Sequence, residues 1–172
     1  MMETPELNPA DESKKKDFIN NDDPIENKGL KISESWAYQT FVKIANRIIH
    51  KPLSVFRLIK QVISNIQRYD SVKELTKDVK DHMMVMVRLV KAYAKGEYRG
   101  ISFQGILGSL AALIYFVAPL DFIPDFLIVG LVDDVAIIMW VYSNYRKEIE
   151  AFLAWEDDKK LRIELSDEET RI

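Results

Sequence analysis

The feature that most constrains this chain is an apolar segment that contains four aspartates and no base. Residues 113–138 read LIYFVAPLDFIPDFLIVGLVDDVAII. The carboxylates belong to Asp121, Asp125, Asp133 and Asp134, and no Lys, Arg or His lies among them. The fold therefore has to accommodate four carboxylates inside its most hydrophobic region, where an unpaired charge is costly.

An uncharged stretch leads into this segment. Residues 101–120 contain no acid or base, and twenty helical residues rise about 30 Å, close to the thickness of the hydrocarbon core of a bilayer. Pro119 ends the predicted helix, and Pro124 prevents a clean restart before it. The stretch is long enough for a transmembrane helix.

Small residues recur along this helix. Gly105 and Ser109 lie four positions apart, as do Gly108 and Ala112, so the two pairs fall on neighbouring faces. In lipid, such faces allow two helices to approach closely. The pattern is common, and by itself it is a weak indication of a membrane helix.

Residues 126–142 form a second apolar stretch, which two aspartates interrupt. Its ten Leu, Ile, Val and Phe residues favour insertion by about 3–6 kcal/mol, and the two aspartates oppose it by about 5–7 kcal/mol. The stretch would not insert alone, but it can form one arm of a hairpin over residues 101–145. The bases that flank the hairpin would keep both of its ends in the cytoplasm. The alternative is a soluble bundle in which residues 103–118 form the central helix.

Three amphipathic helices are predicted before the hairpin. Their boundaries carry helix start and stop signals: near Ser33 to about Lys51, from Pro52 onward, and from a Ser71–Glu74 capping box to Gly96. Residues 31–100 carry fourteen bases and six acids, with the bases opposite the apolar stripes. These helices are either the charged surface of a soluble bundle or a basic layer that lies on anionic lipid.

The composition divides the chain into four parts. Residues 1–30 are predicted to be a disordered tail, residues 31–70 basic amphipathic helices, residues 71–156 a helical domain with the hairpin, and residues 157–172 a charged tail that frays. The first residues contain no apolar run, so no cleavable signal peptide is expected. The absence of Cys excludes disulfides and cysteine nucleophiles. The bases form no arginine–glycine or aromatic-interleaved tract, so no nucleic-acid partner is expected.

One interpretation of the aspartates is structural: they stabilise a tight helix–turn–helix. Asp121 can accept backbone N–H groups in an Asx turn, and Asp125 suits the first turn of a short helix, where the dipole favours a carboxylate. Asp133 can cap the last helix, which has Asp134 in its first turn and its end near Trp155.

Functional interpretations compete with this one. The four carboxylates, with backbone carbonyls from an irregular turn, are a ligand set for Mg²⁺ or Ca²⁺, although their spacing is not that of an EF-hand. Ionisable groups at membrane depth are also candidates for proton or ion handling. A soluble enzyme with paired carboxylates is a further alternative, for which the sequence indicates no substrate. Apart from such a cation, no cofactor is expected.

The same segment contains a pattern that resembles a known family. Its motif is Tyr115-x-x-x-Pro119-x-Asp121-x-Ile123-Pro124-Asp125-Phe126, followed by Gly130 and Asp133-Asp134. Together with segments 92–99 and 152–156, this motif is similar to the YkvA-like domain of unknown function, over roughly residues 72–156. The resemblance implies a small helical membrane protein of bacteria without an established activity, and it makes the motif residues the candidates for a role.

We therefore predict an all-α protein, a helical bundle with an apolar helix–(Pro/Asp turn)–helix hairpin. It is expected at the bacterial inner membrane with both termini in the cytoplasm, or else as a peripheral cytoplasmic protein. The predicted function is a non-enzymatic membrane or interaction module whose Pro/Asp turn fixes the hairpin or docks a partner. The expected partners are the lipid bilayer, anionic lipid bound by the basic helices, and a second copy or another membrane protein.

Overall fold

The fold consists of helices, as the sequence predicts. The computed structural model describes residues 27–28, 31, 33–34, 36–71, 75–118 and 130–170. Its main elements are α3 (Trp36–Ile48), α4 (Pro52–Ser71), α5 (Lys77–Ala94), α6 (Phe103–Val117), α7 (Gly130–Asn144) and α8 (Arg146–Thr170). No strand occurs within these ranges, which confirms the all-α class.

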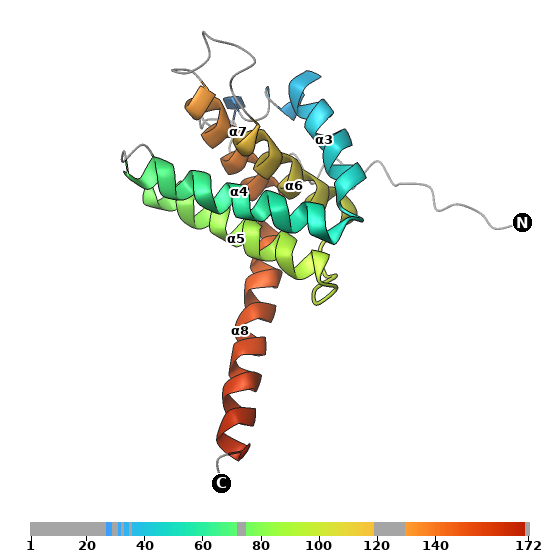
Figure 1. Cartoon of the computed structure of the whole chain (residues 1–172), viewed down its shortest axis with the longest axis vertical. Helices are drawn as coiled ribbons and strands as arrows, with labels where there is room; N and C mark the ends of the chain where they lie inside the picture. Colours follow the sequence, from blue (N-terminus) through green and yellow to red (C-terminus); the bar gives the residue numbers. More distant parts are fainter. Residues whose placement is uncertain are drawn as a thin grey trace, which may run out of the picture.

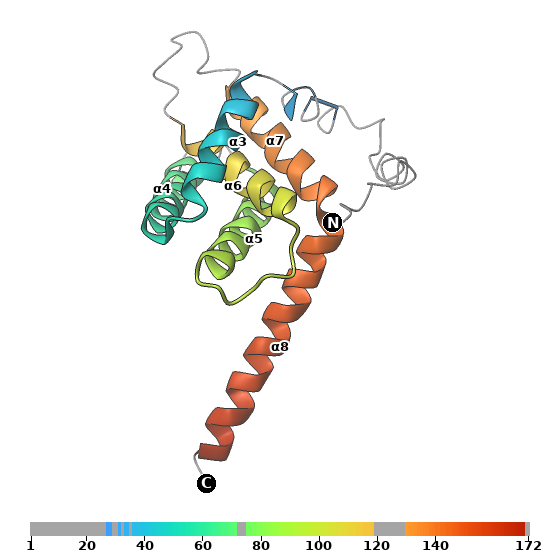
Figure 2. The ribbon, with the colours of Figure 1, turned by 90° about the vertical axis from the view of Figure 1, so that its right-hand side faces the viewer.

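Helix α6 lies at the centre of the bundle. It contacts α3, α4, α5 and α7, and Figures 1 and 2 show these helices packed around it. Leu110, Ala111 and Leu113 are fully buried on it. A helix that is apolar on every side needs such surroundings, whether protein or lipid. Here the surroundings are the other helices of the same chain.

The predicted transmembrane hairpin over residues 101–145 is not supported by this arrangement. Helices α6 and α7 do contact each other, but α3, α4 and α5 cover the remaining sides of α6. The turn of the hairpin falls in residues 119–129, outside the described ranges. Among the helices that the structure describes, none combines the length and the apolar character that crossing a bilayer requires.

The amphipathic helices pack as their periodicity predicts. In α4 the buried stripe includes Val55, Ile59, Val62 and Ile66. In α5 the buried stripe comprises Val79, Met83, Met86, Val87, Leu89, Val90 and Ala92. Because one face of each helix is buried in the bundle, most of the bases on the other faces remain exposed, whereas Lys80 and Arg88 on α5 are half-buried.

The boundary between α4 and α5 differs from the prediction. The capping box at Ser71 and Glu74 is wrong, because Ser71 is the last residue of α4 and α5 begins at Lys77. Thr76 is the N-cap, and its Oγ1 accepts the backbone N–H of Val79 at 3.4 Å. Helix α4 continues this far because its last turn still has a packing partner: the ring centroid of Tyr69 lies 5.6 Å from that of Phe116.

The predicted stop at Gly96 is confirmed. Its φ is +76°, a conformation that favours glycine. The N–H of Gly96 donates to the carbonyl of Tyr93 at 3.0 Å, and the N–H of Glu97 donates to that of Ala92 at 2.9 Å. These two bonds form a Schellman motif, which satisfies carbonyls at the end of α5 and turns the chain toward α6.

The last helix is longer than predicted and is divided. It begins at Gly130, is interrupted at Tyr145 and continues to Thr170, so the fraying predicted for residues 157–172 is wrong up to that residue. Ion pairs along the surface of α8 support its outer half, including Arg162 to Asp158 at 2.7 Å. Such pairs each stabilise a helix by roughly 0.2–0.5 kcal/mol. Figures 1 and 2 show α8 projecting away from the bundle.

The small residues of α6 provide close contacts within the chain. The Oε2 atom of Glu148 accepts both the N–H and the Oγ hydrogen of Ser102, each at 2.9 Å. A Cβ atom at Gly105 would lie only 2.7 Å from this Oε2, and one at Gly108 only 3.0 Å from Cε2 of Tyr145. The two glycines therefore allow the junction of α7 and α8 to pack against the start of α6.

Gly105→Ala is expected to destabilise the protein, although Ala normally stabilises a helix interior by about 0.5–1 kcal/mol relative to Gly. The new Cβ would displace Glu148 from Ser102, so we expect a net loss of about 1–2 kcal/mol in the free energy of unfolding, measured by urea denaturation. The loss should be smaller in a Glu148→Ala background, where the carboxylate is absent. An equal loss in both backgrounds would contradict this account of Gly105.

Candidate functional site

The Pro/Asp motif occupies the connection between α6 and α7. Helix α6 ends at Val117, two residues before Pro119, and α7 begins at Gly130. Six motif residues lie outside the described ranges: Pro119, Asp121, Ile123, Pro124, Asp125 and Phe126. The described structure therefore places the two ends of the motif and leaves the arrangement of its centre a prediction.

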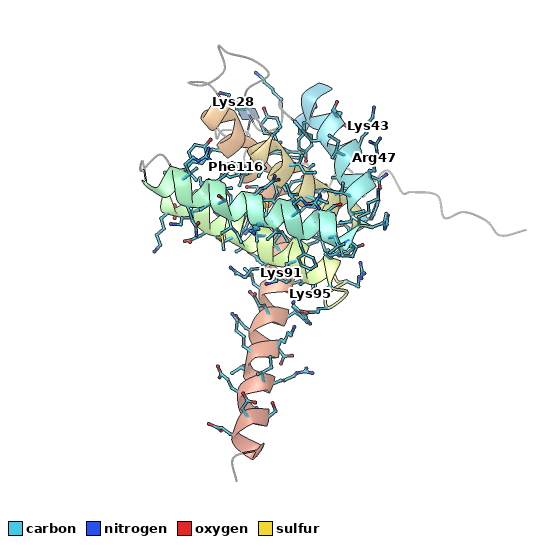
Figure 3. The ribbon with its side chains drawn as sticks, viewed as in Figure 1. Lys28, Lys43, Arg47, Lys91, Lys95 and Phe116 are labelled. Atoms are coloured by element: carbon cyan, nitrogen blue, oxygen red, sulfur yellow. The ribbon has the colours of Figure 1, made fainter. Side chains whose placement is uncertain are left out.

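Aromatic contacts fix the point where the chain enters the motif. Tyr115, the first motif residue, has its ring centroid 5.4 Å from that of Phe41 on α3, in an edge-on arrangement at 87°. The next residue, Phe116, is buried and contacts Tyr69 on α4. Phe116 is labelled in Figure 3. The end of α6 is thus held by two other helices before the motif begins.

The aspartate pair at the far end of the motif lies inside α7. Asp133 and Asp134 are the fourth and fifth residues of a helix that begins at Gly130. The prediction that Asp133 caps this helix is therefore wrong, because the helix starts three residues earlier. The described side chains contain no group of three or more His, Cys, Asp or Glu that could hold a metal ion. The four motif aspartates lie beyond that description, so the cation site remains a prediction.

A second candidate site is a basic surface at the opposite end of α6. Here α3 ends, α4 begins, α5 ends and α6 begins, and Figure 2 looks toward this end of the bundle. We call it the basic end and define it by its exposed bases: Lys43, Arg47, Lys51, Arg57, Lys91, Lys95 and Arg99. Figure 3 shows Lys43 and Arg47 on α3, Lys91 in the last turn of α5 and Lys95 directly after that helix.

The acids of α4 and α5 lie at one end of these helices, whereas their bases lie at both ends. Asp70 is in the last turn of α4 and Asp78 and Asp81 are in the first turns of α5, away from the basic end and close in sequence to Arg68, Lys77 and Lys80. Two large apolar side chains are exposed at the basic end instead: Leu53 at 81% and Phe103 at 48%. The basic end thus combines positive charge with exposed apolar surface.

The structure also brings together two sequence segments that flank the motif. Tyr98, in segment 92–99, has its ring centroid 5.2 Å from that of Phe152 and 5.0 Å from that of Trp155, both in segment 152–156. Phe152 is almost completely buried. These contacts connect the end of α5 to α8, and we call the group the α5–α8 clamp.

Ion pairs extend the clamp. Nε of Arg88 donates to both carboxylate oxygens of Glu156, at 3.0 and 3.1 Å. Nζ of Lys159 lies 2.6 Å from Oε2 of Glu97, and Nζ of Lys95 lies 3.6 Å from Oε1 of the same side chain. The hydrogen bond from Lys159 is the main reason why the pKa of Glu97 is lower than its usual value.

Sequence reasoning missed several of these residues. Arg88 and Glu156 are 68 positions apart, Lys159 and Glu97 are 62 apart, and Ser102 and Glu148 are 46 apart. Each lies on a helix surface among other charged residues, so no local pattern distinguishes it. Pairs of this kind become visible only when the topology brings α5 and the start of α6 against α8.

The comparisons with known proteins agree with the motif. Residues 106–140, from the start of α6 to within α7, match the family described as "Protein of unknown function (DUF1232)". The chain is also 28% identical, over 75 residues, to the "Uncharacterized membrane protein YkvA" of Bacillus subtilis (strain 168), which covers 43% of this chain and 71% of that protein. Together these findings confirm the predicted resemblance to the YkvA-like family. No solved structure matches the chain.

The predicted cation site can be tested on the intact protein. If the four motif aspartates bind Mg²⁺ or Ca²⁺, either ion should raise the melting temperature, because a ligand that binds the folded state stabilises it. Asp133→Asn with Asp134→Asn should abolish the rise, whereas Asp157→Asn with Asp158→Asn on α8 should leave it intact. A melting temperature that neither cation changes would rule the site out.

The clamp has a pH signature. The carboxyl of Glu97 has a pKa below its ordinary 4.5, so its contacts stabilise the fold above that pH and lose this effect as the pH falls through the lowered pKa. Glu97→Gln should therefore lower the melting temperature at neutral pH, and the difference should disappear in acid. Glu164→Gln on the exposed part of α8 is the control and should have little effect at any pH. A deficit that persists unchanged in acid would contradict this assignment.

Proposed function

We propose that the protein is a non-enzymatic helical module that associates with the cytoplasmic face of the bacterial inner membrane. In this proposal the basic end faces anionic lipid. The Pro/Asp motif, at the other end of α6, fixes α6 and α7 relative to each other or docks a partner. The similarity to an uncharacterized membrane protein supports the location.

The observation that carries the proposal is the set of unpaired bases at the basic end. Within the described residues, five of its seven exposed bases form no ion pair: Lys43, Arg47, Lys51, Arg57 and Lys91. A base near an anionic membrane surface gains roughly 1 kcal/mol. Several bases that face the same way can hold a protein of this size to a bilayer without a spanning helix.

The two remaining bases of this end do not weaken the argument. Lys95 pairs with Glu97, whose carboxylate also accepts Lys159. The guanidinium of Arg99 lies 4.1 Å from the ring centroid of Tyr93, which holds the base in place without neutralising it. Glu97 is therefore already engaged with two lysines, and the carboxylate of Glu148, at the start of α6, accepts hydrogen bonds from Ser102.

A non-enzymatic role rests on the sequence. The chain contains no cysteine and no glycine-rich phosphate loop, and His50 and His82 show no ligand spacing. The motif carboxylates are the remaining candidates for chemistry. We propose that they act structurally or in partner docking, because the helices on both sides of the motif are packed into the core.

Membrane binding can be measured by flotation with vesicles. The full chain should float with vesicles that contain phosphatidylglycerol and not with vesicles of phosphatidylcholine alone, and added salt should weaken the binding. Arg47→Glu with Lys91→Glu should reduce the affinity by about a hundredfold or more, since four units of charge change at the surface.

The matched control is Lys160→Glu with Arg162→Glu, which makes the same change in net charge on the projecting part of α8. It should retain most of the binding. Equal losses in the two double variants would indicate that only net charge matters. No binding to anionic vesicles would contradict the proposed function.

A further inference from the structure

We propose that the basic end does more than adsorb to the membrane: Leu53 and Phe103 insert between the headgroups of an anionic bilayer. This inference rests on the proposed function and adds to it the residues that enter the lipid and the end of the molecule that faces it. The occupant of this surface is thus an anionic lipid bilayer.

Leu53 is highly exposed and contributes little to the core of the bundle. It is the second residue of α4, and 81% of its surface is accessible. The core-facing residues of the same turns are Val55 and Leu58, which are buried. Leu53 therefore lies outside the apolar stripe that packs α4 against the bundle, and it is surrounded in sequence by Lys51 and Arg57.

Phe103 occupies an equivalent position on α6. It is the first residue of that helix and is 48% exposed, although α6 is the most buried helix of the bundle. The Cα–Cβ bonds of a helix tilt toward its N-terminus, so side chains in a first turn extend toward or beyond the end of the helix. Leu53 and Phe103 both lie in first turns, and both of these turns lie at the basic end (Figure 2).

Exposed apolar side chains are common on proteins, so their surroundings decide what they bind. The other large exposed apolar residues of the described chain are Leu161, Ile163 and Leu165 on α8. Around these three lie four acids and three bases, several of which pair with one another: Asp157, Asp158, Glu164, Asp167, Lys159, Lys160 and Arg162. Apolar residues among unpaired bases are the combination that binds anionic interfaces, whereas charges of both signs that pair within one helix give little attraction to them.

The chain offers a direct comparison between the two exposed groups. Because it contains no cysteine, a single introduced cysteine can be labelled specifically. We would attach an environment-sensitive nitrobenzoxadiazole dye to Leu53→Cys and, separately, to Leu161→Cys. Both positions are exposed, so neither substitution opens a cavity in the core.

With vesicles that contain phosphatidylglycerol, the dye at position 53 should shift to the blue, brighten and be quenched by lipids that carry a nitroxide on the upper acyl chain. The dye at position 161 should keep the spectrum it has in water. Leu53→Ser with Phe103→Ser should weaken vesicle binding about tenfold or more, while Leu161→Ser with Leu165→Ser should not. Circular dichroism would verify that all variants keep their helix content.

The outcomes separate this inference from the proposed function. If the protein floats with anionic vesicles but both dyes remain in water, the basic end only adsorbs and insertion is wrong. If the dye at position 161 enters the lipid instead, the projecting part of α8 contacts the membrane and the inference is overturned. If the protein does not float with anionic vesicles at all, the proposed function fails together with the inference.

Discussion

The fold depends on the burial of α6. This helix is apolar on every side, so it is stable only where it is covered all round. Helices α3, α4, α5 and α7 cover it, and α3 to α5 each have one apolar stripe. A helix with one such stripe must turn its remaining side chains outward. The exposed bases of α3 to α5 therefore follow from the burial of α6. The basic end lies where the ends of α3 and α5 and the start of α4 come close to the start of α6.

Periodicity and capping signals predicted the helix features that depend on nearby residues. They located the stripes of α4 and α5, the start of α4 at Pro52 and the Schellman turn at Gly96, because each depends on residues within one or two turns. They failed where distant partners decide the outcome. Packing of Tyr69 on Phe116 extends α4 past the apparent capping box. The absence of charge in residues 101–120 could not reveal that protein rather than lipid surrounds α6.

The candidate sites also include features that nearby residues determine and features that depend on residues far apart in the chain. The motif and its family resemblance were recognisable from sequence because their residues are consecutive, and the family match lies over that segment. The α5–α8 clamp and the contact between Glu148 and Ser102 join residues far apart in the chain, so they required the topology. The clamp also orders the turn that contributes Lys95 and Arg99 to the basic end. Its stability and the shape of the proposed lipid-facing surface are therefore coupled.

The projection of α8 has a consequence for how the charges of the molecule act. Residues 157–170 extend for roughly 21 Å of helix, and interactions between exposed charges are screened over about 8 Å at physiological ionic strength. The start of this part reaches the basic end through Lys159, which pairs with Glu97, but the acids toward its far end act only weakly on the bases there. Within the described helices the charges are therefore unevenly distributed, and an anionic surface interacts with the charges nearest to it rather than with the net charge of the chain.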